Sequence, residues 1–258
     1  MTIDVGNTRT KWAIFNQANA IVANGVFGNT ELGEAPQEWA ECALAVISNV
    51  AADEMAARLK TMLAPIAHQH WIGALVSGFG IKNGYAQPEL LGCDRWAAMV
   101  GARQYTEQSC LVVNAGTALT IDAMQREPTT GSHIFVGGVI VPGWRLMQQA
   151  LYQGTHGINH ALAESHSGSD AKAGKYVDLP RNTEDAVYTG ALMAMVGAIE
   201  QMSLRLQRQA HTGIQCMITG GDALLLAERL RSGAVISDIV MIEDLVLRGL
   251  LVIGREIR

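Results

Sequence analysis

The feature that most constrains the fold of this chain is an order of strands and helices that its two halves share. The first half contains β-type apolar runs at residues 10–15, 20–27, 44–49 and 71–77. Apolar side chains at helical spacing predict a helix over residues 51–63. These patterns predict the order β-β-β-α-β-α-β, in which hairpins come first and crossover connections follow.

The second half repeats that order. Strands are predicted in the segments "CLVVNAGTALTIDAM" and "HIFVGGVIVPG", at the start of "IQCMITGGDALLLAERL" and in "AVISDIVMI". Helices are predicted over residues 181–210, after the Gly-Gly turn of the third segment, and over residues 243–258. We therefore expect an α/β protein of two similar halves, residues 1–108 and 109–258, with a cleft between them.

Two glycine-containing turns occupy corresponding places in these halves. Residues 3–8 read Ile-Asp-Val-Gly-Asn-Thr and residues 113–117 read Val-Asn-Ala-Gly-Thr, and each turn lies between two predicted strands. Backbone preferences alone explain one such turn as a plain hairpin. Two matching turns favour another interpretation, in which the tips face each other across a cleft and hold a polyphosphate from both sides.

Composition limits the classes of partner. Hydrophobic residues make up 49% of the chain and charged residues 17%, which is typical of globular proteins. The formal net charge of -5 argues against nucleic acid, whereas small anions remain possible ligands. No apolar run reaches the roughly 18 to 20 residues of a membrane span, and the start lacks a secretion signal. The four cysteines do not have CxxC spacing, and we expect them to be reduced thiols in a cytoplasmic protein.

The predicted helix over residues 181–210 is apolar on more than one face. A helix with such wide apolar coverage is either buried centrally or shared with a second subunit. We favour the second interpretation and expect a homodimer.

Six segments together carry a family resemblance that covers essentially the whole chain. They are "DVGNTRTKWA", "NGYAQPELLGCDRWAAMVGA", "NAGTALTID", "GGVIVPGWRLMQQAL", "RNTEDAV" and "ITGGDA". In this order and spacing the chain resembles the type III pantothenate kinases, members of the acetate and sugar kinase, Hsp70 and actin superfamily. The residues by themselves predict a two-lobed nucleotide phosphotransferase and do not name pantothenate.

The resemblance implies a duplicated ribonuclease H-like fold, as in the actin-like ATPases, with two βββαβαβ halves around a central cleft. It also implies ATP-dependent phosphorylation of pantothenate, the first step of coenzyme A biosynthesis. The enzyme would be a homodimer that needs Mg²⁺ and a monovalent cation, K⁺ or NH₄⁺.

On the phosphate side, the resemblance implies that Asp4 holds Mg²⁺ directly or through water, although an Asp before a hairpin can also bond its own backbone. The other residues implied to face the ATP phosphates are Gly6, Asn7, Thr8, Lys11, Gly116 and Thr117. Lys11 could equally be a solvated strand residue. Gly220 and Gly221 are similar to the superfamily's adenosine-side turn, or form only a turn after a strand.

On the acceptor side, Asp94 resembles the family's catalytic base, which takes the hydroxyl proton of the substrate. A structural interpretation is that Asp94 caps the helix that follows. Tyr85, Gly92 and Arg95 match the family's pantothenate contacts. An Arg in the first helical turn opposes the helix dipole and therefore needs another partner.

Thr183 matches a threonine that reaches the neighbouring subunit's substrate, so each active site would need both chains. The simpler interpretation makes Thr183 the N-cap of the long helix, with Asn182 as its rival.

The chain departs from the family pattern at Asn114, where the family usually has an Asp associated with the monovalent cation. Asn keeps a carbonyl oxygen but loses the charge, which puts cation affinity in doubt. The short segment before Asp4 predicts an abbreviated first strand or a trimmed start.

Two rival functions remain open at this point. A kinase of the same superfamily could act on another small alcohol, because the phosphate hairpins are shared and only the region from Tyr85 to Arg95 selects the acceptor. A nucleotide-binding regulator without transfer activity is the second rival, and the presence of Asp94 argues against it.

Overall fold

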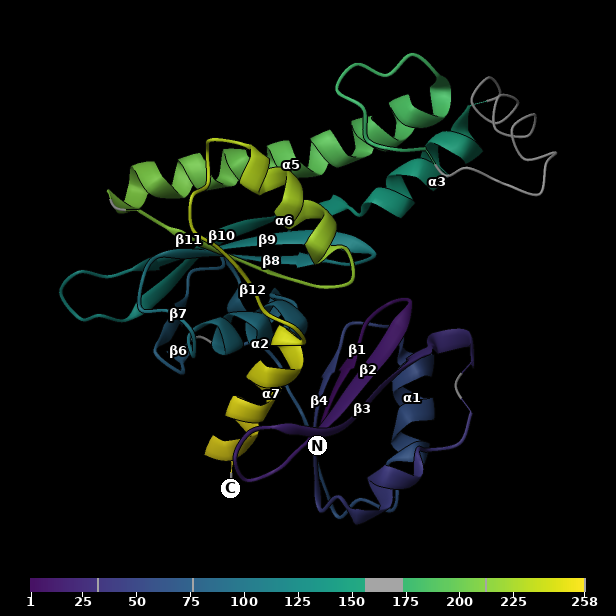
Figure 1. Ribbon diagram of the computed structural model, residues 1–258. Coiled ribbons are helices and arrows are strands. Elements are labelled where there is room, and N and C mark those ends of the chain that lie inside the picture. The colour runs from purple at the N-terminus through teal and green to yellow at the C-terminus, as the bar shows by residue number, and fades with distance from the viewer. Residues whose placement is uncertain (32, 76, 156–173, 212, 258) are drawn as a thin grey trace.

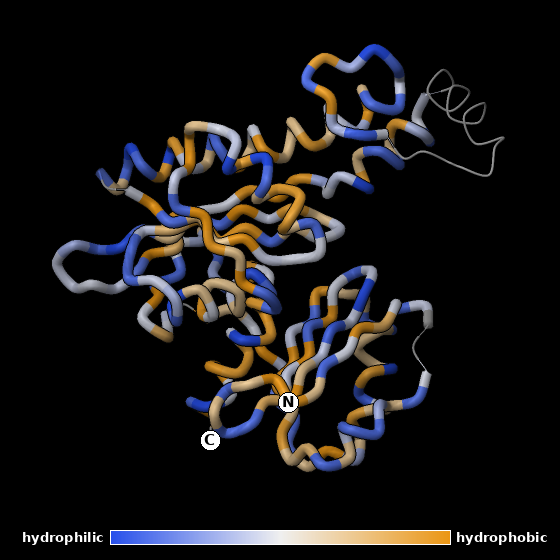
Figure 2. Tube along the Cα trace, viewed as in Figure 1, coloured by the Kyte–Doolittle hydropathy of each residue, from blue (hydrophilic) through white to orange (hydrophobic). Residues whose placement is uncertain are grey.

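The computed structural model describes residues 1–31, 33–75, 77–155, 174–211 and 213–257. Two sheets form two lobes, and helices α2 (Cys93–Ala102) and α7 (Leu245–Glu256) lie between them (Figure 1). Figure 2 shows hydrophobic residues concentrated along the strands and the inner helices, with hydrophilic residues on the outer loops.

The first lobe is built on a sheet with the strand order β3-β2-β1-β4-β5. Its strands are β1 (Thr2–Val5), β2 (Arg9–Phe15), β3 (Ile21–Gly28), β4 (Leu44–Asn49) and β5 (His68–Trp71). The first three strands pair as antiparallel hairpins, whereas β4 lies parallel to β1 and β5 parallel to β4. Helix α1 (Asp53–Met62) makes the crossover from β4 to β5 and packs through Met55 and Leu59.

The second sheet has the order β12-β11-β8-β9-β10-β7-β6. Its strands are β6 (Ser77–Gly78), β7 (Ile81–Asn83), β8 (Cys110–Ala115), β9 (Ala118–Arg126), β10 (His133–Pro142), β11 (Gln215–Thr219) and β12 (Ile239–Met241). The strands β10-β9-β8-β11-β12 repeat the order and the parallel or antiparallel sense of the first sheet. The predicted duplication of an α/β unit is therefore confirmed.

The remaining helices lie mostly on the outer face of the second sheet, where α5 and α6 cover it in Figure 1. They are α3 (Trp144–Gly154), α5 (Thr183–Ala210) and α6 (Ala223–Ser232). The chain also has short 3₁₀ turns in its first half, which are η1 (Asn29–Glu31), η2 (Gln37–Glu41) and η3 (Pro88–Leu90). Among the described residues, no helix combines the length and the apolar character needed to cross a membrane.

The two halves of the chain exchange elements. Strands β6 and β7 come from the first half but pair at the edge of the second sheet, whereas α7 comes from the second half and packs against β1 and β4. The predicted single strand over residues 71–77 is therefore wrong, because β5 ends at Trp71 in one sheet and β6 begins at Ser77 in the other. The division at residues 108 and 109 stays a prediction.

Helices α2 and α7 pack closely because each has a glycine at their crossing. A Cβ atom on Gly249 would lie 1.8 Å from the carbonyl oxygen of Ala97, and one on Gly101 would lie 2.6 Å from that of Leu245. Their side chains join the largest apolar cluster, which includes Val46 from the first sheet and others from the second. The first turn of α2 lies beside the end of β4, where Cys93 Sγ donates to the carbonyl oxygen of Asn49 at 3.4 Å.

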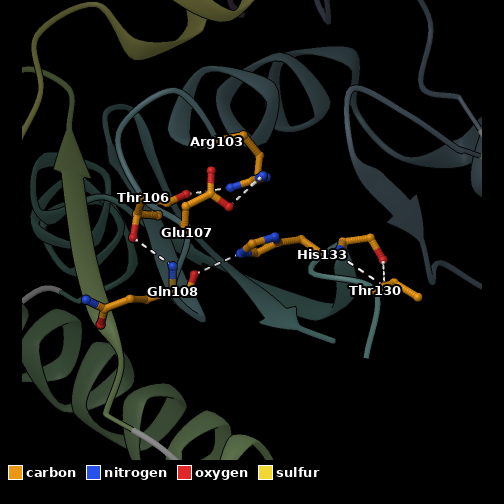
Figure 3. Close-up of polar contacts among 7 residues, drawn as sticks. Arg103, Thr106, Glu107, Gln108, Thr130 and His133 are labelled. Atoms are coloured by element: carbon orange, nitrogen blue, oxygen red, sulfur yellow. Dashed lines mark hydrogen bonds and ion pairs between the residues drawn. The ribbon is translucent and has the colours of Figure 1, made fainter. Parts of the chain in front are cut away.

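A polar cluster holds the connection from α2 to β8 (Figure 3). Arg103 donates through Nη1 to the carbonyl oxygen of Thr106 at 2.5 Å and pairs with Glu107 at 3.2 Å. The buried His133 donates through Nε2 to the carbonyl oxygen of Gln108 at 2.9 Å, and burial lowers its pKa. These bonds connect the segment after α2 to β10, and we interpret the cluster as structural.

Candidate active site

The two glycine-containing turns meet at their tips. The turn between β1 and β2 closes through a bond from the Gly6 amide to the Arg9 carbonyl at 3.0 Å, and the turn between β8 and β9 closes from Gly116 to Ala118 at 3.1 Å. The Thr117 hydroxyl donates to the Thr8 hydroxyl at 3.1 Å. Residues 109 positions apart are thus joined through their hydroxyls, and the exposed Asn7 precedes Thr8 in the first turn.

Asp4 lies at the base of the first hairpin, directly across the strand pair from Lys11. Its Oδ1 atom is buried and has no hydrogen-bond partner among the described residues. Burial raises the pKa of Asp4 to about 7, repulsion from Asp94 adds to this rise, and Lys11 and a hydrogen bond with Ser48 oppose it. A buried carboxylate oxygen without a partner fits a divalent cation, since Mg²⁺ prefers oxygen ligands.

Lys11 forms an ion pair that the sequence did not indicate. Its Nζ atom lies 3.3 Å from Oδ1 of Asp244, which is 233 residues further along the chain. Asp244 precedes α7 with a left-handed φ of 52° and makes no side-chain cap bond to that helix. The Lys11 side chain is 40% exposed, and together with Asp244 it lines a surface hollow beside Trp12 and Leu247. A role of Lys11 toward phosphates stays a prediction.

Asp94 is the second residue of α2, and Gly92 is the N-cap residue. The interpretation of Asp94 as the helix cap is therefore wrong, although its Oδ1 accepts the Arg95 amide at 2.8 Å. A Cβ atom on Gly92 would lie 2.6 Å from Asp94 Oδ1, so the glycine leaves space for the carboxylate. Burial raises the pKa of Asp94, and bonds and charge from Arg95 oppose the rise.

Arg95 is buried, and its partner is Asp122 on β9. Its Nε atom lies 3.0 Å from Oδ1 and 3.2 Å from Oδ2 of that carboxylate, and its Nη2 atom also bonds Oδ1. The guanidinium carbon lies 5.9 Å from the ring centroid of Tyr85 and 5.7 Å from that of Phe135. The predicted need of Arg95 for another partner is thus met by Asp122.

The adenosine-side turn follows β11. Gly220 has a φ of 102°, and a Cβ atom there would lie 2.2 Å from the Ala115 carbonyl oxygen, so this position needs glycine. Gly221 faces open space. Asn114 is the next-to-last residue of β8, between Thr120 and Thr219 in the neighbouring strands and next to the second hairpin.

Thr183 lies apart from these groups, at the first turn of α5 beside α3 (Figure 1). The N-cap of α5 is Asn182, whose Oδ1 accepts the Asp185 amide at 2.8 Å, so the interpretation of Thr183 as the cap is wrong and its rival is confirmed. Thr183 instead lines a hollow on the surface together with Leu151 and Val187.

Several residues of this site were not predicted from the sequence: Ser48, Asp122, Phe135 and Asp244. Asp122 lies within the quoted segment "NAGTALTID", but alternation along a strand could not show which buried side chain it faces. Asp244 falls within the helix predicted over residues 243–258, and nothing in that pattern indicates its distant partner.

The fold defines the class of protein. Over 99% of its length the chain resembles a putative 2-dehydro-3-deoxygalactonokinase from Sinorhizobium meliloti, with a TM-score of 0.59, 12% identity and 98% of that chain covered. It also resembles a non-polymerisable pCBH ParM mutant, with a TM-score of 0.50, 12% identity and the same coverage. The duplicated ribonuclease H-like fold of actin-like ATPases and sugar kinases is therefore confirmed.

Within that class, the sequence profile of the type III pantothenate kinases matches residues 1–205. A type III pantothenate kinase from Methylobacillus flagellatus is 39% identical over 97% of this chain and 95% of its own length. That from Nitrosospira multiformis is 38% identical over 99% of this chain and 91% of its own. The chain belongs to the type III pantothenate kinase family.

Proposed function

We propose that this protein transfers the γ-phosphoryl group of ATP to pantothenate and forms 4'-phosphopantothenate, the first step of coenzyme A biosynthesis. Family membership supports the reaction. The observation that supports its location is the contact between Thr8 and Thr117, which joins the two glycine-containing turns, and Asp4 lies on the strand that leads into the first of them. The Asp94 carboxylate lies close enough to Asp4 to raise its pKa.

The phosphate side is the group of Asp4, Gly6, Asn7, Thr8, Lys11, Gly116 and Thr117. In phosphoryl transfer the charge spreads over the equatorial oxygens, so positioned donors and cations supply most of the stabilisation. Asp4 would hold Mg²⁺, which would supply positive charge to neutralise the phosphates. Lys11 would add a positive charge from the neighbouring strand. On the adenosine side, Gly220 lets the turn approach Ala115 closely, and Gly221, which faces open space, would leave room for the adenosine.

Asp94 is proposed as the base that accepts the proton of the substrate hydroxyl. Its burial raises the basicity of the ionised carboxylate, and a loose transition state asks little more of it than orientation. The first turn of α2, held by the packing of α2 on α7, supplies that orientation.

The acceptor would lie over Tyr85, Gly92 and Arg95, and Thr183 of a second subunit would complete the site. Ala186, Gly190, Met193 and Gly197 lie three or four positions apart on α5, and no atom lies within 4 Å of a Cβ built on either glycine. Such a stripe lets a second helix approach closely. We therefore propose a homodimer with α5 at its interface.

Asn114 would contribute its amide oxygen to a monovalent cation, K⁺ or NH₄⁺, near the second hairpin. An amide oxygen without charge binds a cation less strongly than a carboxylate. We also propose a cytoplasmic location, because the cysteines Cys42, Cys93, Cys110 and Cys216 are free thiols.

The test is ADP release by purified protein given ATP, Mg²⁺ and pantothenate, with and without potassium or ammonium. We expect turnover that depends on pantothenate and rises with the added cation. Asp94→Asn should cut turnover at least about a hundredfold while the Kd for ATP stays within about twofold. Turnover only with another alcohol would make the protein a different kinase, and ATP binding without turnover would make it a regulator.

A further inference from the structure

The ion pair of Arg95 and Asp122 is buried almost completely, with 6% of Arg95 and 1% of Asp122 exposed. It joins the first turn of α2 to the middle of β9. A buried pair of this kind contributes little net stability, because the cost of removing two charges from water offsets their attraction. A role in holding the guanidinium in place explains the pair better than a role in stability.

Asp122 constrains the orientation of Arg95. Its carboxylate holds the Nε and Nη2 atoms, which fixes the plane of the guanidinium. The rings of Tyr85 and Phe135, which stack with centroids 6.0 Å apart, lie beside the same guanidinium. Without the carboxylate, a long Arg side chain would have several rotamers available in this region.

The neighbouring strand leaves space for this pair. Gly138 on β10 lies opposite Asp122 in the register of the sheet. A Cβ atom on Gly138 would come within 2.2 Å of Asp122 Oδ1 and 2.6 Å of Arg95 Nη2. The strand therefore accommodates the two charged groups only because it has glycine at this point.

We propose that Asp122 is a positioning residue that orients the Arg95 guanidinium toward the substrate that accepts the phosphoryl group. Asp122 thereby determines the affinity for a substrate whose oxygen atoms can accept hydrogen bonds from Arg95. The inference rests on the proposed role of Arg95 in acceptor binding. In this proposal Asp122 does not contact the substrate itself. It affects the binding of pantothenate through Arg95 and does not affect the binding of ATP.

The experiment measures kcat and both KM values for Asp122→Asn, Arg95→Met and the double variant, with the melting temperature of each. We expect Asp122→Asn to raise the KM for pantothenate about tenfold or more, while kcat and the KM for ATP stay within about twofold. The double variant should have the pantothenate KM of Arg95→Met, because Asp122 has no further effect once Arg95 is absent.

Met124→Leu is the matched control, because Met124 is buried on the same strand two positions further on. We expect it to leave the pantothenate KM unchanged even if its melting temperature falls. If Asp122→Asn does not fold, Asp122→Glu serves in its place, since it keeps the charge and displaces the carboxylate by one methylene group.

Two results would count against different claims. A normal pantothenate KM in the Asp122 variant, together with a raised KM in Arg95→Met, overturns the positioning role and leaves the proposed function intact. A normal pantothenate KM in Arg95→Met contradicts the proposed acceptor contact itself.

Discussion

At the scale of single residues, Asp4 shows how a site group can oppose folding. Burial raises its pKa from 3.8 to about 7, so the folded protein binds a proton that the unfolded chain releases in that pH range. Because the native state binds more protons between these two values, the free energy of unfolding decreases as pH rises from about 4 to 7 and levels off above.

Asp4→Asn should therefore stabilise the ligand-free protein above pH 7, by about 1–3 kcal/mol, because the amide carries no charge to desolvate. The gain should be small near pH 4. The same variant should lose nearly all turnover, because an amide binds Mg²⁺ poorly. Melting temperatures at several pH values and the ADP assay measure both effects.

The exposed Asp178→Asn serves as its control and should change neither quantity. If the Asp4→Asn protein is less stable than the parent at pH 8, burial of the charged Asp4 carboxylate does not destabilise the folded protein.

At the scale of elements, α5 has one face that the described chain buries and one that it leaves in solvent. Leu192, Met195 and Ile199 pack onto the second sheet, whereas Met193 is 58% exposed. The apolar coverage noted in the sequence thus divides into a core face and an outer stripe, and the outer stripe is where the proposed dimer would form.

Met193→Lys should convert the dimer to a monomer, because a charged side chain at the centre of an apolar helix interface is costly to desolvate. Light scattering should give the monomer mass, and pantothenate turnover should fall while ATP binding remains. Leu224→Lys on α6 is the matched control, since Leu224 is also 58% exposed. Equal masses for Met193→Lys and the parent protein would contradict an interface on this stripe.

At the scale of the whole molecule, the proposed active site combines two halves of one chain with one residue of another. The contact between Thr8 and Thr117 joins the halves. Helix α5, which begins at Thr183, lies on the opposite face of the second sheet from α2 (Figure 1). In a symmetric dimer, each chain would lend this residue to its partner.

Refolding a mixture of Asp94→Asn and Thr183→Val should test that arrangement. In a random mixture about one quarter of the sites would combine an intact Asp94 with an intact Thr183, so activity should exceed that of either variant alone. A mixture of Asp94→Asn with Arg95→Met should show no rescue, because both residues come from the same chain. Absence of rescue in the first mixture would mean that each chain forms its site alone.

The duplicated α/β plan, the two glycine-containing turns and most of the candidate site residues could be predicted from local patterns and motif order along the chain. The predicted order was wrong at one point, because the described residues between β3 and β4 form the turns η1 and η2 instead of an α-helix. Strand periodicity and turn chemistry depend on near neighbours, so residues such as Gly6 and Gly116 indicate hairpins without knowledge of the rest. The family motifs added the proposed roles of Asp4, Asp94 and Arg95.

The partners of those residues depended on how the elements dock. The pairs of Arg95 with Asp122 and of Lys11 with Asp244 join distant segments, and so does the division of residues 71–77 between two sheets. Each side chain has an adequate local explanation, as a strand residue or a helix cap, and only packing selects among these. Hydrogen bonds and ion pairs act over a few ångströms in space, whatever the separation along the chain, and local pattern therefore predicts elements better than contacts.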